Sequence, residues 1–520
     1  MAGEQVRKEQ GALHEPVGEA SLSPAGSLAG ASLLARGNRL LWLGLPGCAS
    51  LLLMAVTNKL CEDLASIPFL WVLPLILYLI TFIVCFDSGA WYRRGLWQAG
   101  FWLWLPVMAY GLVKYDSIPW PAHVVVYGFG LLVACMICHG ELYRLRPAPA
   151  DLTQFYLMIA AGGALGGGFV AVGAPVLFDG FFELYAGLLL LAGLLVVIHV
   201  REKLSFRRSG RPVALWPFTL GAGLLLAVLV GVLVWAEHYR VIERHRDFYG
   251  VCRILELHKD NPLAHARMFM SGGTVHGVQY LHPISATWPT TYYDRGSGVG
   301  QVLDRLPAPR RIGIVGLGIG TLAAYGQPGD VIRFYELSPY VAEVAGTRFS
   351  YLAQSAAQIE VALGDARLSL ESEAPQDFDV LVLDAFTSDA IPVHLLTREA
   401  FDIYRRHLKP GGVLAVHSSN RHLELSSVIR RLAACWGVPV AEVRHRPGSD
   451  RPEAMSSNWT LLSDNPEILA LPALRFSASK AETAADGAAL WTDDHVSLLP
   501  RLKYGSKKAG REVEGNGVKH

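Results

Sequence analysis

Seven apolar stretches follow one another between residues 40 and 236, and they constrain this chain more than any other feature. Most of them approach the ~20 residues that an α-helix needs to cross a bilayer. Tryptophans stand near the ends of these stretches, where interfacial aromatic side chains are favoured. The sequence therefore predicts a transmembrane helical domain over residues 39–236. The predicted spans are 40–58, 67–86, 96–114, 120–138, 154–177, 184–200 and 213–236.

The overall composition agrees with a membrane portion and argues against one class of partner. The mean hydropathy is +0.30, 52% of residues are hydrophobic and only 18% are charged, which is apolar for a soluble protein. A net charge of +1 argues against a nucleic-acid binder, because such proteins usually carry a strong basic excess. Seven cysteines are spread along the chain and imply no disulfide framework.

Outside the apolar stretches, the chain divides into tails, a connector and a second globular part. Residues 1–38 and 505–520 are polar, and we predict that they are disordered tails. Residues 237–247 are charged and are predicted to form a connector. Short β-type segments predict a small β subdomain over residues 248–298, and alternating β and α patterns predict a Rossmann-like domain over residues 299–504.

A glycine turn between two buried strands opens the Rossmann-like part. The apolar residues of 312–315 indicate a central parallel strand. Gly316, Gly318 and Gly320 permit a tight turn and a close approach of the backbone to a ligand. Glu336 ends the next strand, where a carboxylate can accept hydrogen bonds from ribose hydroxyls. Together these residues predict a site for an adenosine-containing cofactor, although an ordinary strand–turn–helix can carry the same glycines.

Acidic side chains follow two later strands of the same part, at Asp365 and Asp384. Because parallel strands of a doubly wound sheet end at one edge, we expect these two acids to lie near Glu336. Asp365 can accept the exocyclic amine of an adenine. Asp384 can take a proton from an amine or bind a cation, and the alternative is that it caps the following helix. His417 follows the next strand and is a further candidate, and residue 321 is expected to begin a helix facing the turn.

Side chains of the small β subdomain are placed to cover this edge. Gln279, Tyr292 and Tyr293 offer amide and aromatic groups that suit an aliphatic amine chain, and His276 is a further candidate. Asp389 adds a second carboxylate near the site. We predict substrate-binding roles for Gln279, Tyr292, Tyr293 and Asp389, with ordinary packing as the alternative for each of the three covering side chains. No metal is predicted in the site.

Two parts of the chain resemble known families. Residues 248–502 resemble the spermidine/spermine synthase (aminopropyltransferase) domain, in which a small β piece precedes a Rossmann-like S-adenosylmethionine-type fold. The motifs that carry this resemblance are Gly316–Gly320, Glu336, Gly364–Asp365 and Asp384–Asp389. The apolar part resembles the bacterial membrane proteins often called fused transporter-like/spermidine synthases. The segments that carry that second resemblance are Ser50–Asn58, Pro68–Pro74 and Gly162–Gly166.

The resemblance implies a reaction and gives roles to the acids. An aminopropyl group would move from decarboxylated S-adenosylmethionine to a polyamine-type amine, with release of methylthioadenosine. By the resemblance, Glu336 binds the ribose, Asp365 binds the adenine and Asp384 is the catalytic base. The fold that it implies is an α-helical transmembrane bundle followed by an α/β Rossmann-like domain with a small N-terminal β piece.

Three positions depart from the soluble spermidine synthases. Those enzymes carry an aspartate within the glycine loop, where this chain has Ile319. Their acids follow an Asp-x-x-Asp-Pro pattern, whereas Asp384 and Asp389 stand two residues further apart. Their Tyr-(His/Gln)-Glu signature corresponds here to Tyr292-Tyr-Asp294. Two alternatives therefore stay open: an S-adenosylmethionine-dependent methyltransferase acting on a lipid or membrane-delivered amine, and a non-catalytic transporter or sensor that binds an adenosine metabolite.

Loop charges and the expected cofactor disagree about orientation. Arginines follow the second, fourth and sixth predicted spans, and the positive-inside rule places those loops and the N-terminus in the cytoplasm. Seven full crossings would then export the second globular part, whereas a nucleotide-type cofactor is expected in the cytoplasm. We follow the cofactor and predict an integral protein of a bacterial-type inner membrane with a cytoplasmic catalytic domain. Its expected partners are a small amine and membrane lipids, but no nucleic acid, and homo-oligomer formation stays open.

Overall fold

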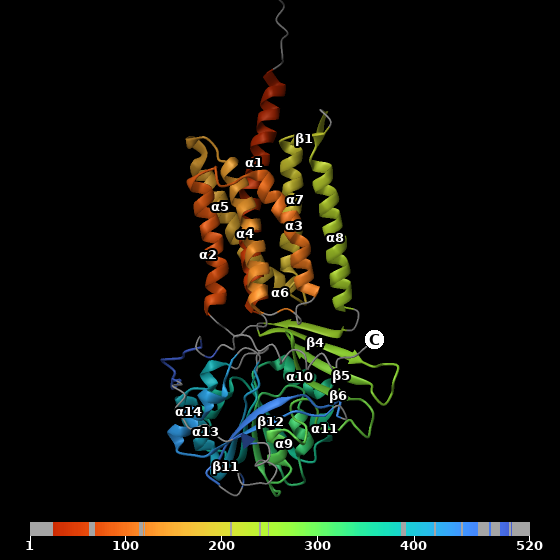
Figure 1. The fold of residues 1–520 in the computed structure, drawn as a ribbon, viewed down its shortest axis with the longest axis vertical. Helices are drawn as coiled ribbons and strands as arrows, with labels where there is room; N and C mark the ends of the chain where they lie inside the picture. The colour runs from red at the N-terminus through yellow and green to blue at the C-terminus, as the bar shows by residue number, and fades with distance from the viewer. Residues whose placement is uncertain are drawn as a thin grey trace, which may run out of the picture.

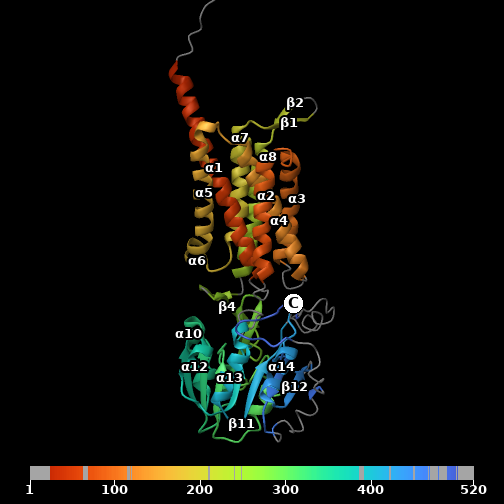
Figure 2. The same cartoon turned by 90° about the vertical axis from the view of Figure 1, so that its left-hand side faces the viewer.

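The protein has two parts arranged end to end, a helical bundle and an α/β part (Figure 1). Figure 2 shows the same two parts from the side. The computed structural model describes residues 24–61, 68–113, 118, 120–208, 211–238, 241–247, 249–385, 392–420, 423–448, 451–465, 468, 478–479, 489–498 and 501.

The bundle consists of long apolar helices that run along one common axis (Figures 1 and 2). Short helices flank or continue α5, namely η2 (Pro149–Asp151), the π-helical η3 (Phe169–Gly173) and α6 (Ala174–Leu177). The long helices are α1 (Pro24–Cys61), α2 (Pro68–Asp87), α3 (Arg94–Val113), α4 (Trp120–Arg144), α5 (Leu152–Gly168), α7 (Glu183–Arg201) and α8 (Trp216–His238).

Six helical segments within the described residues are long and apolar enough to cross a membrane. They coincide with all of the predicted spans except 96–114. That stretch does form a helix, α3, but its tryptophans, Gln98 and Pro106 lower its hydropathy. The structure therefore supplies six candidate spans where the sequence predicted seven, and α3 packs in the bundle through buried Phe101 and Met108.

Close contact between α1 and α5 depends on glycines. A Cβ atom at Gly162 would lie 2.2 Å from the carbonyl oxygen of Leu43, and one at Gly166 would lie 2.0 Å from that of Gly47. Backbone atoms cannot give way as a flexible side chain can, so any larger residue would push the two helices apart. The glycines of α5 therefore permit the close contact between these two helices.

The arginine-rich loops and the α/β part lie at opposite ends of the bundle. At one end, Arg94 of α3 bonds Glu141 of α4 (Nε–Oε1 2.6 Å) and Glu202 just after α7 (Nη1–Oε2 2.5 Å). A hairpin of β1 (Ser205–Arg208) and β2 (Arg211–Ala214), which the sequence did not predict, stands at that end (Figure 1). The α/β part adjoins the other end.

Two predicted boundaries are corrected at the ends of the bundle. Residues 24–38 belong to helix α1 rather than to a disordered tail, and residues 1–23 lie outside the described residues. Residues 241–247, predicted as a connector, form strand β3 because they pair with β4. The resulting antiparallel sheet has the order β3 (Val241–Asp247), β4 (Gly250–Leu257), β5 (Ala266–Ser271) and β6 (Thr274–Tyr280).

A larger, mixed sheet forms the centre of the α/β part. Its order is β14-β12-β13-β11-β10-β7-β8-β9, in which β7 to β11 are parallel and β12 to β14 pair antiparallel. The predicted doubly wound parallel sheet is thus corrected at one edge. The bounds are β7 (Arg311–Val315), β8 (Val331–Glu336), β9 (Gln358–Leu363), β10 (Phe378–Leu383), β11 (Leu408–His417), β12 (Val440–His445), β13 (Ser457–Leu462) and β14 (Ala478–Ser479).

The strand order reverses between β7 and β10, which are neighbours at the centre of the sheet. Ligands of open α/β sheets bind at the carboxyl ends of strands beside such a reversal. Both strands are buried on both faces, as their apolar runs predict. The surrounding helices are α9 (Gly298–Leu303), η4 (Thr321–Tyr325), α10 (Pro339–Thr347), α11 (Tyr351–Gln354), α12 (Ala366–Ser372), η5 (Val393–Leu395), α13 (Arg398–His407) and α14 (Ser426–Trp436).

Candidate active site

The glycine loop follows β7 and lies directly against the end of β10. Gly316, Gly318 and Gly320 have φ values of +96°, +53° and +79°, a region that favours glycine. A Cβ atom at Gly316 would lie 2.4 Å from the backbone oxygen of Asp384. The loop therefore needs its first glycine to bring the ends of the two strands together. Cofactor binding by the three glycines stays a prediction.

The helix expected after the glycine loop is short. Residues Thr321–Tyr325 form a single 3-10 turn, η4, and a turn of that length has no extended helix dipole. Ile319 is 1% exposed and packs under β6, where a Cβ atom at Gly277 would meet its Cγ1 at 2.4 Å. The side chain of Ile319 therefore points into the core.

Glu336, predicted to bind ribose, holds the glycine loop in place. Its Oε2 accepts a hydrogen bond from the backbone N–H of Leu317 (2.9 Å), and its Oε1 accepts one from Ser338 (2.8 Å). Burial raises the pKa of Glu336, and these backbone N–H groups act in the opposite direction. The carboxylate lies at the predicted edge of the sheet, and ribose binding stays a prediction.

Asp365, predicted to bind adenine, caps helix α12. Its Oδ1 accepts from the backbone N–H of Leu368 (3.0 Å), and its Oδ2 lies 3.1 Å from Nε2 of His394. An N-cap of this kind fixes the side chain beside the end of β9. Its role toward adenine stays a prediction.

Asp384 stands at the end of β10 and binds two partners from different elements. Tyr293 donates from Oη to Oδ2 (2.5 Å), and Nδ1 of His417, at the end of β11, lies 2.6 Å from Oδ1. The side chains of Asp384 and His417 are only 8% and 5% exposed. Burial, followed by the negative charge of Asp384, raises the pKa of Tyr293 well above its usual range, so this hydroxyl stays a donor.

The covering segment that contains Tyr292 and Tyr293 is anchored on both sides. Trp459 donates from Nε1 to the backbone oxygen of Tyr292 (3.2 Å), and Tyr325 donates from Oη to that of Tyr293 (2.5 Å). Asp294 then pairs with His445 at 2.9 Å. These contacts hold the two tyrosines at the site, as predicted, while their contact with a substrate stays a prediction.

The structure places the other predicted residues less directly. Gln279 is buried, and its side-chain amide bonds Ala286, Ser350 Oγ and the backbone N–H of Ser350, so it serves as a structural bridge. Asp389 lies outside the described residues. His276 is half-buried close to Asp384, and its inaccessible Nε2 has no partner within the described ranges. Burial lowers the pKa of His276 to about 4, so the ring is neutral at pH 7.

The site also contains three residues that the sequence did not predict there, namely Trp459, Ser419 and Asn458. The ring of Trp459 stacks on that of His417 with centroids 4.6 Å apart and an interplanar angle of 13°. Ser419 Oγ lies 2.9 Å from Nε2 of His417 and accepts a hydrogen bond from the backbone N–H of Asn458 (2.8 Å). The antiparallel pairing of β13 with β11 brings Trp459 and Asn458 to the site, and no local motif signals it. Ser419 lies there because it follows His417 by two positions.

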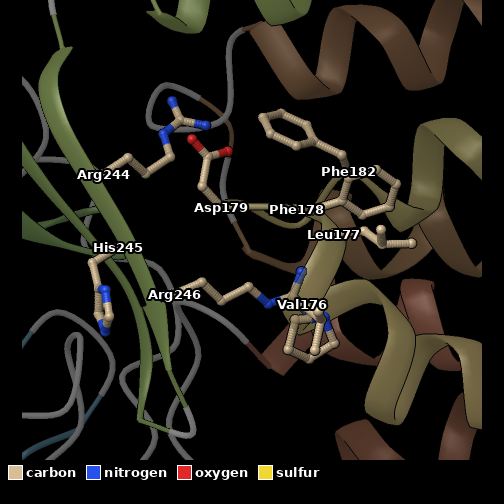
Figure 3. Close-up of a pocket in the computed structure, with 9 residues that line it drawn as sticks. Val176, Leu177, Phe178, Asp179, Phe182, Arg244, His245 and Arg246 are labelled. Atoms are coloured by element: carbon tan, nitrogen blue, oxygen red, sulfur yellow. The ribbon is translucent and has the colours of Figure 1, made fainter.

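A cleft of about 550 Å³ lies elsewhere, where the bundle meets β3 (Figure 3). Figure 3 shows the guanidinium of Arg244 beside the carboxylate of Asp179. Arg246 donates to Glu183 of α7 (3.0 Å) and to the backbone oxygen of Gly180 (2.6 Å). Since the lining contains none of the predicted site residues, this cleft belongs to the joint between the two parts.

No metal site is evident in the part of the chain that the structure describes. No group of three or more His, Cys, Asp or Glu side chains there is arranged to hold an ion. The site instead offers a carboxylate, two tyrosines and two imidazoles at the edge of a Rossmann-type sheet. Such a set can bind a cationic amine and accept a proton from it.

The proteins that are similar to this chain include polyamine aminopropyltransferases. No family model matches the chain. The chain is 33% identical over 117 residues to a polyamine aminopropyltransferase of Vibrio vulnificus, and 28% identical over 154 residues to a probable polyamine aminopropyl transferase of Bifidobacterium longum. These matches take in 22% and 29% of this chain. They span only 38% and 33% of the two relatives, about a third of their length.

Solved structures of similar proteins include two spermidine synthases. One, a probable spermidine synthase from Corynebacterium glutamicum, has 19% identity and a TM-score of 0.34 over 42% of this chain and 79% of its own. Another, from Thermotoga maritima, has 15% identity and a TM-score of 0.32 over 49% of this chain and 82% of its own. TM-scores this low do not establish a shared fold. The strand order of the large sheet by itself identifies the Rossmann-type arrangement.

Proposed function

We propose that this protein is a membrane-embedded aminopropyltransferase that moves an aminopropyl group from decarboxylated S-adenosylmethionine to an amine. The polyamine aminopropyltransferases to which the chain is similar support the reaction class. The six apolar helices support membrane insertion. The proposal assigns the adenosine portion to the glycine loop, Glu336 and Asp365, and the amine to Asp384.

The observation that carries the proposal is the setting of Asp384. Its backbone lies against the glycine loop, where the reactive part of an adenosine-linked donor would lie, and its carboxylate accepts a hydrogen bond from the anchored Tyr293. In such a transfer, the amine nitrogen bonds to the aminopropyl carbon while the carbon–sulfur bond breaks, and the sulfur keeps the electron pair. The amine gives up one proton, and Asp384 is the acidic group at hand to receive it.

Product analysis with the purified full-length protein tests this reaction. Decarboxylated S-adenosylmethionine and S-adenosylmethionine are each offered with a series of primary amines, and products are identified by mass spectrometry. We expect aminopropylated amine and methylthioadenosine from the decarboxylated donor. The variant Asp384→Asn should lose transfer and still bind methylthioadenosine in calorimetry. Full activity in that variant would rule out Asp384 as the base.

A methyltransferase is the second candidate, and the buried position of Ile319 favours it. The soluble spermidine synthases that the chain resembles carry an aspartate in the glycine loop. Here Ile319 stands at that position, and its apolar side chain is packed under β6. If S-adenosylmethionine yields a methylated amine or lipid, the protein is a methyltransferase and the first proposal is wrong. Binding of adenosine metabolites without any product would indicate a sensor or transporter.

A further inference from the structure

A chain of hydrogen bonds runs through the candidate site from a backbone amide to the carboxylate. The backbone N–H of Asn458 donates to Ser419 Oγ (2.8 Å), Ser419 Oγ lies 2.9 Å from His417 Nε2, and His417 Nδ1 lies 2.6 Å from Asp384 Oδ1. Tyr293 closes the chain on the other carboxylate oxygen. Asp384 is thus linked to four residues, of which His417 and Ser419 come from the end of β11, Asn458 from β13 and Tyr293 from the covering segment.

This series of hydrogen bonds determines which nitrogen of His417 carries the proton. An ionised carboxylate can only accept hydrogen bonds, so Nδ1, which faces Asp384, must be the protonated nitrogen. In the neutral ring, Nε2 is then an acceptor, and the hydroxyl of Ser419 is the donor that it meets. Every contact in the chain is satisfied in this one tautomer.

Packing holds the ring of His417 in the same orientation. One face stacks on Trp459, and Tyr292 lies with its ring centroid 5.4 Å away. His417 is paired in register with Trp459 across β11 and β13, so the stack follows from the strand pairing. The ring can therefore fix the angle of the Asp384 carboxylate, rather than follow it.

We propose that His417 is a positioning residue, which aims the carboxylate of Asp384 at the amine through the Nδ1–H bond. This inference rests on the proposed function, because it names what His417 does for that reaction. The imidazole keeps Oδ1 occupied, so the proton of the amine must arrive along the remaining lone pairs of the carboxylate. Ser419 donates to Nε2 and so stabilises the tautomer with the proton on Nδ1, which is the tautomer that can bond Oδ1 of Asp384.

The kinetic test compares two substitutions that differ in one hydrogen bond. His417→Asn keeps an N–H donor close to the position of Nδ1, whereas His417→Leu keeps bulk against Trp459 without any donor. We expect His417→Leu to lower kcat by about 10²-fold, the usual effect of a misplaced reacting group, with little change in methylthioadenosine affinity. His417→Asn should recover most of that loss. Equal activity of the two variants would overturn the proposal.

The pH dependence provides a readout that a merely structural role would not move. A carboxylate that loses a donor holds its proton more tightly, so the acid limb of the rate profile should move to higher pH in His417→Leu. The ionisable groups around His417 are Asp384, Tyr292, Tyr293 and His276, and all four are kept in this variant. An unchanged acid limb would overturn the proposal.

Nuclear magnetic resonance separates this inference from the proposed function. In the resting full-length protein with 15N-labelled histidine, the His417 signals should show the Nδ1–H tautomer, and Asp384→Asn should alter it. Ser419→Ala should also perturb these signals. Ser418→Ala is the matched control, because Ser418 Oγ bonds the backbone oxygen of Asn458 (3.2 Å) instead of the ring. An Nε2–H tautomer in the wild type would refute the arrangement, whereas absence of product from every donor would refute only the proposed reaction.

Discussion

Replacing Gly316 by alanine tests whether the glycine loop and the end of β10 need the contact that the structure shows. The new Cβ atom would lie 2.4 Å from the backbone oxygen of Asp384, 2.9 Å from its carbonyl carbon and 3.2 Å from Cα of Ala385. All three atoms are backbone, so relief requires movement of β10 rather than rotation of a side chain. The φ of +96° adds a conformational cost for any residue with a Cβ atom.

The expected loss of stability follows from these two contributions. A left-handed backbone costs an L-residue roughly 1–2 kcal/mol. Overpacking in a tight interior costs about 1–3 kcal/mol more. The free energy of unfolding should therefore fall by about 2–5 kcal/mol, and the melting temperature of the α/β part by roughly 4–20 °C.

Differential scanning calorimetry of the full chain measures this loss, with Gly346→Ala as the control. Gly346 lies in α10, and no atom lies within 4 Å of the Cβ position there. That substitution should raise stability by about 0.5–1 kcal/mol, because alanine is the better helix former. In Gly316→Ala, displacement of the glycine loop, to which we assign the adenosine portion, should also weaken methylthioadenosine binding. Wild-type stability and affinity in Gly316→Ala would show that the loop does not depend on this contact.

Three further predictions follow from ion pairs and helix order. Arg310 and Asp330 form a buried pair, with side chains 1% and 0% exposed, so Arg310→Met should destabilise the protein by about 3–5 kcal/mol in chemical unfolding. Burial alone would raise the pKa of Asp330, but hydrogen bonds from Arg310 and from backbone N–H groups hold it below its ordinary value. The stabilisation by Asp330 is therefore present above that ordinary value and is lost as pH falls through the lowered pKa. In Arg310→Met, burial acts on this pKa without the opposing hydrogen bonds of Arg310, so the loss of stability in acid should be smaller than in the wild type. A wild-type dependence of the free energy of unfolding on pH would contradict this. At the joint between the bundle and the α/β part, Arg246→Met leaves Glu183 buried without its cation and should speed proteolysis between the two parts. The double variant Arg246→Met with Glu183→Gln should recover part of the resistance to proteolysis. Equal cleavage of the two variants would count against the ion pair as the link. Finally, exposed Cys435 and a cysteine introduced as Arg146→Cys should react with an impermeant thiol reagent from opposite sides of sealed vesicles, and labelling of both from one side would contradict the order of the helices.

Sequence periodicity was sufficient for the elements themselves. The apolar run of 312–315 predicted the buried strand β7 closely, because a strand covered on both faces reads as continuous hydrophobic residues. The glycine spacing predicted the loop after β7, since only glycine adopts its positive φ values without strain. Local patterns failed where pairing decides structure: charged residues 241–247 became a strand through contact with β4, and the last strands paired antiparallel.

The sequence alone determined that apolar helices precede a Rossmann-type sheet and that Asp384 ends its central strand, because both follow from residue order and hydrophobic period. Only the tertiary structure decided what Asp384 touches. Tyr293 lies 91 positions before it and His417 lies 33 positions after it, and no local pattern reports such distances. The register of β10 with β11 brings His417 to Asp384, and the anchored covering segment brings Tyr293 there. Buried polar groups must find partners at such a place. The tertiary structure likewise buries Ile319 in the core and uses the Gln279 side chain for structural hydrogen bonds. The sequence does not report either, because packing depends on neighbours in space rather than in sequence.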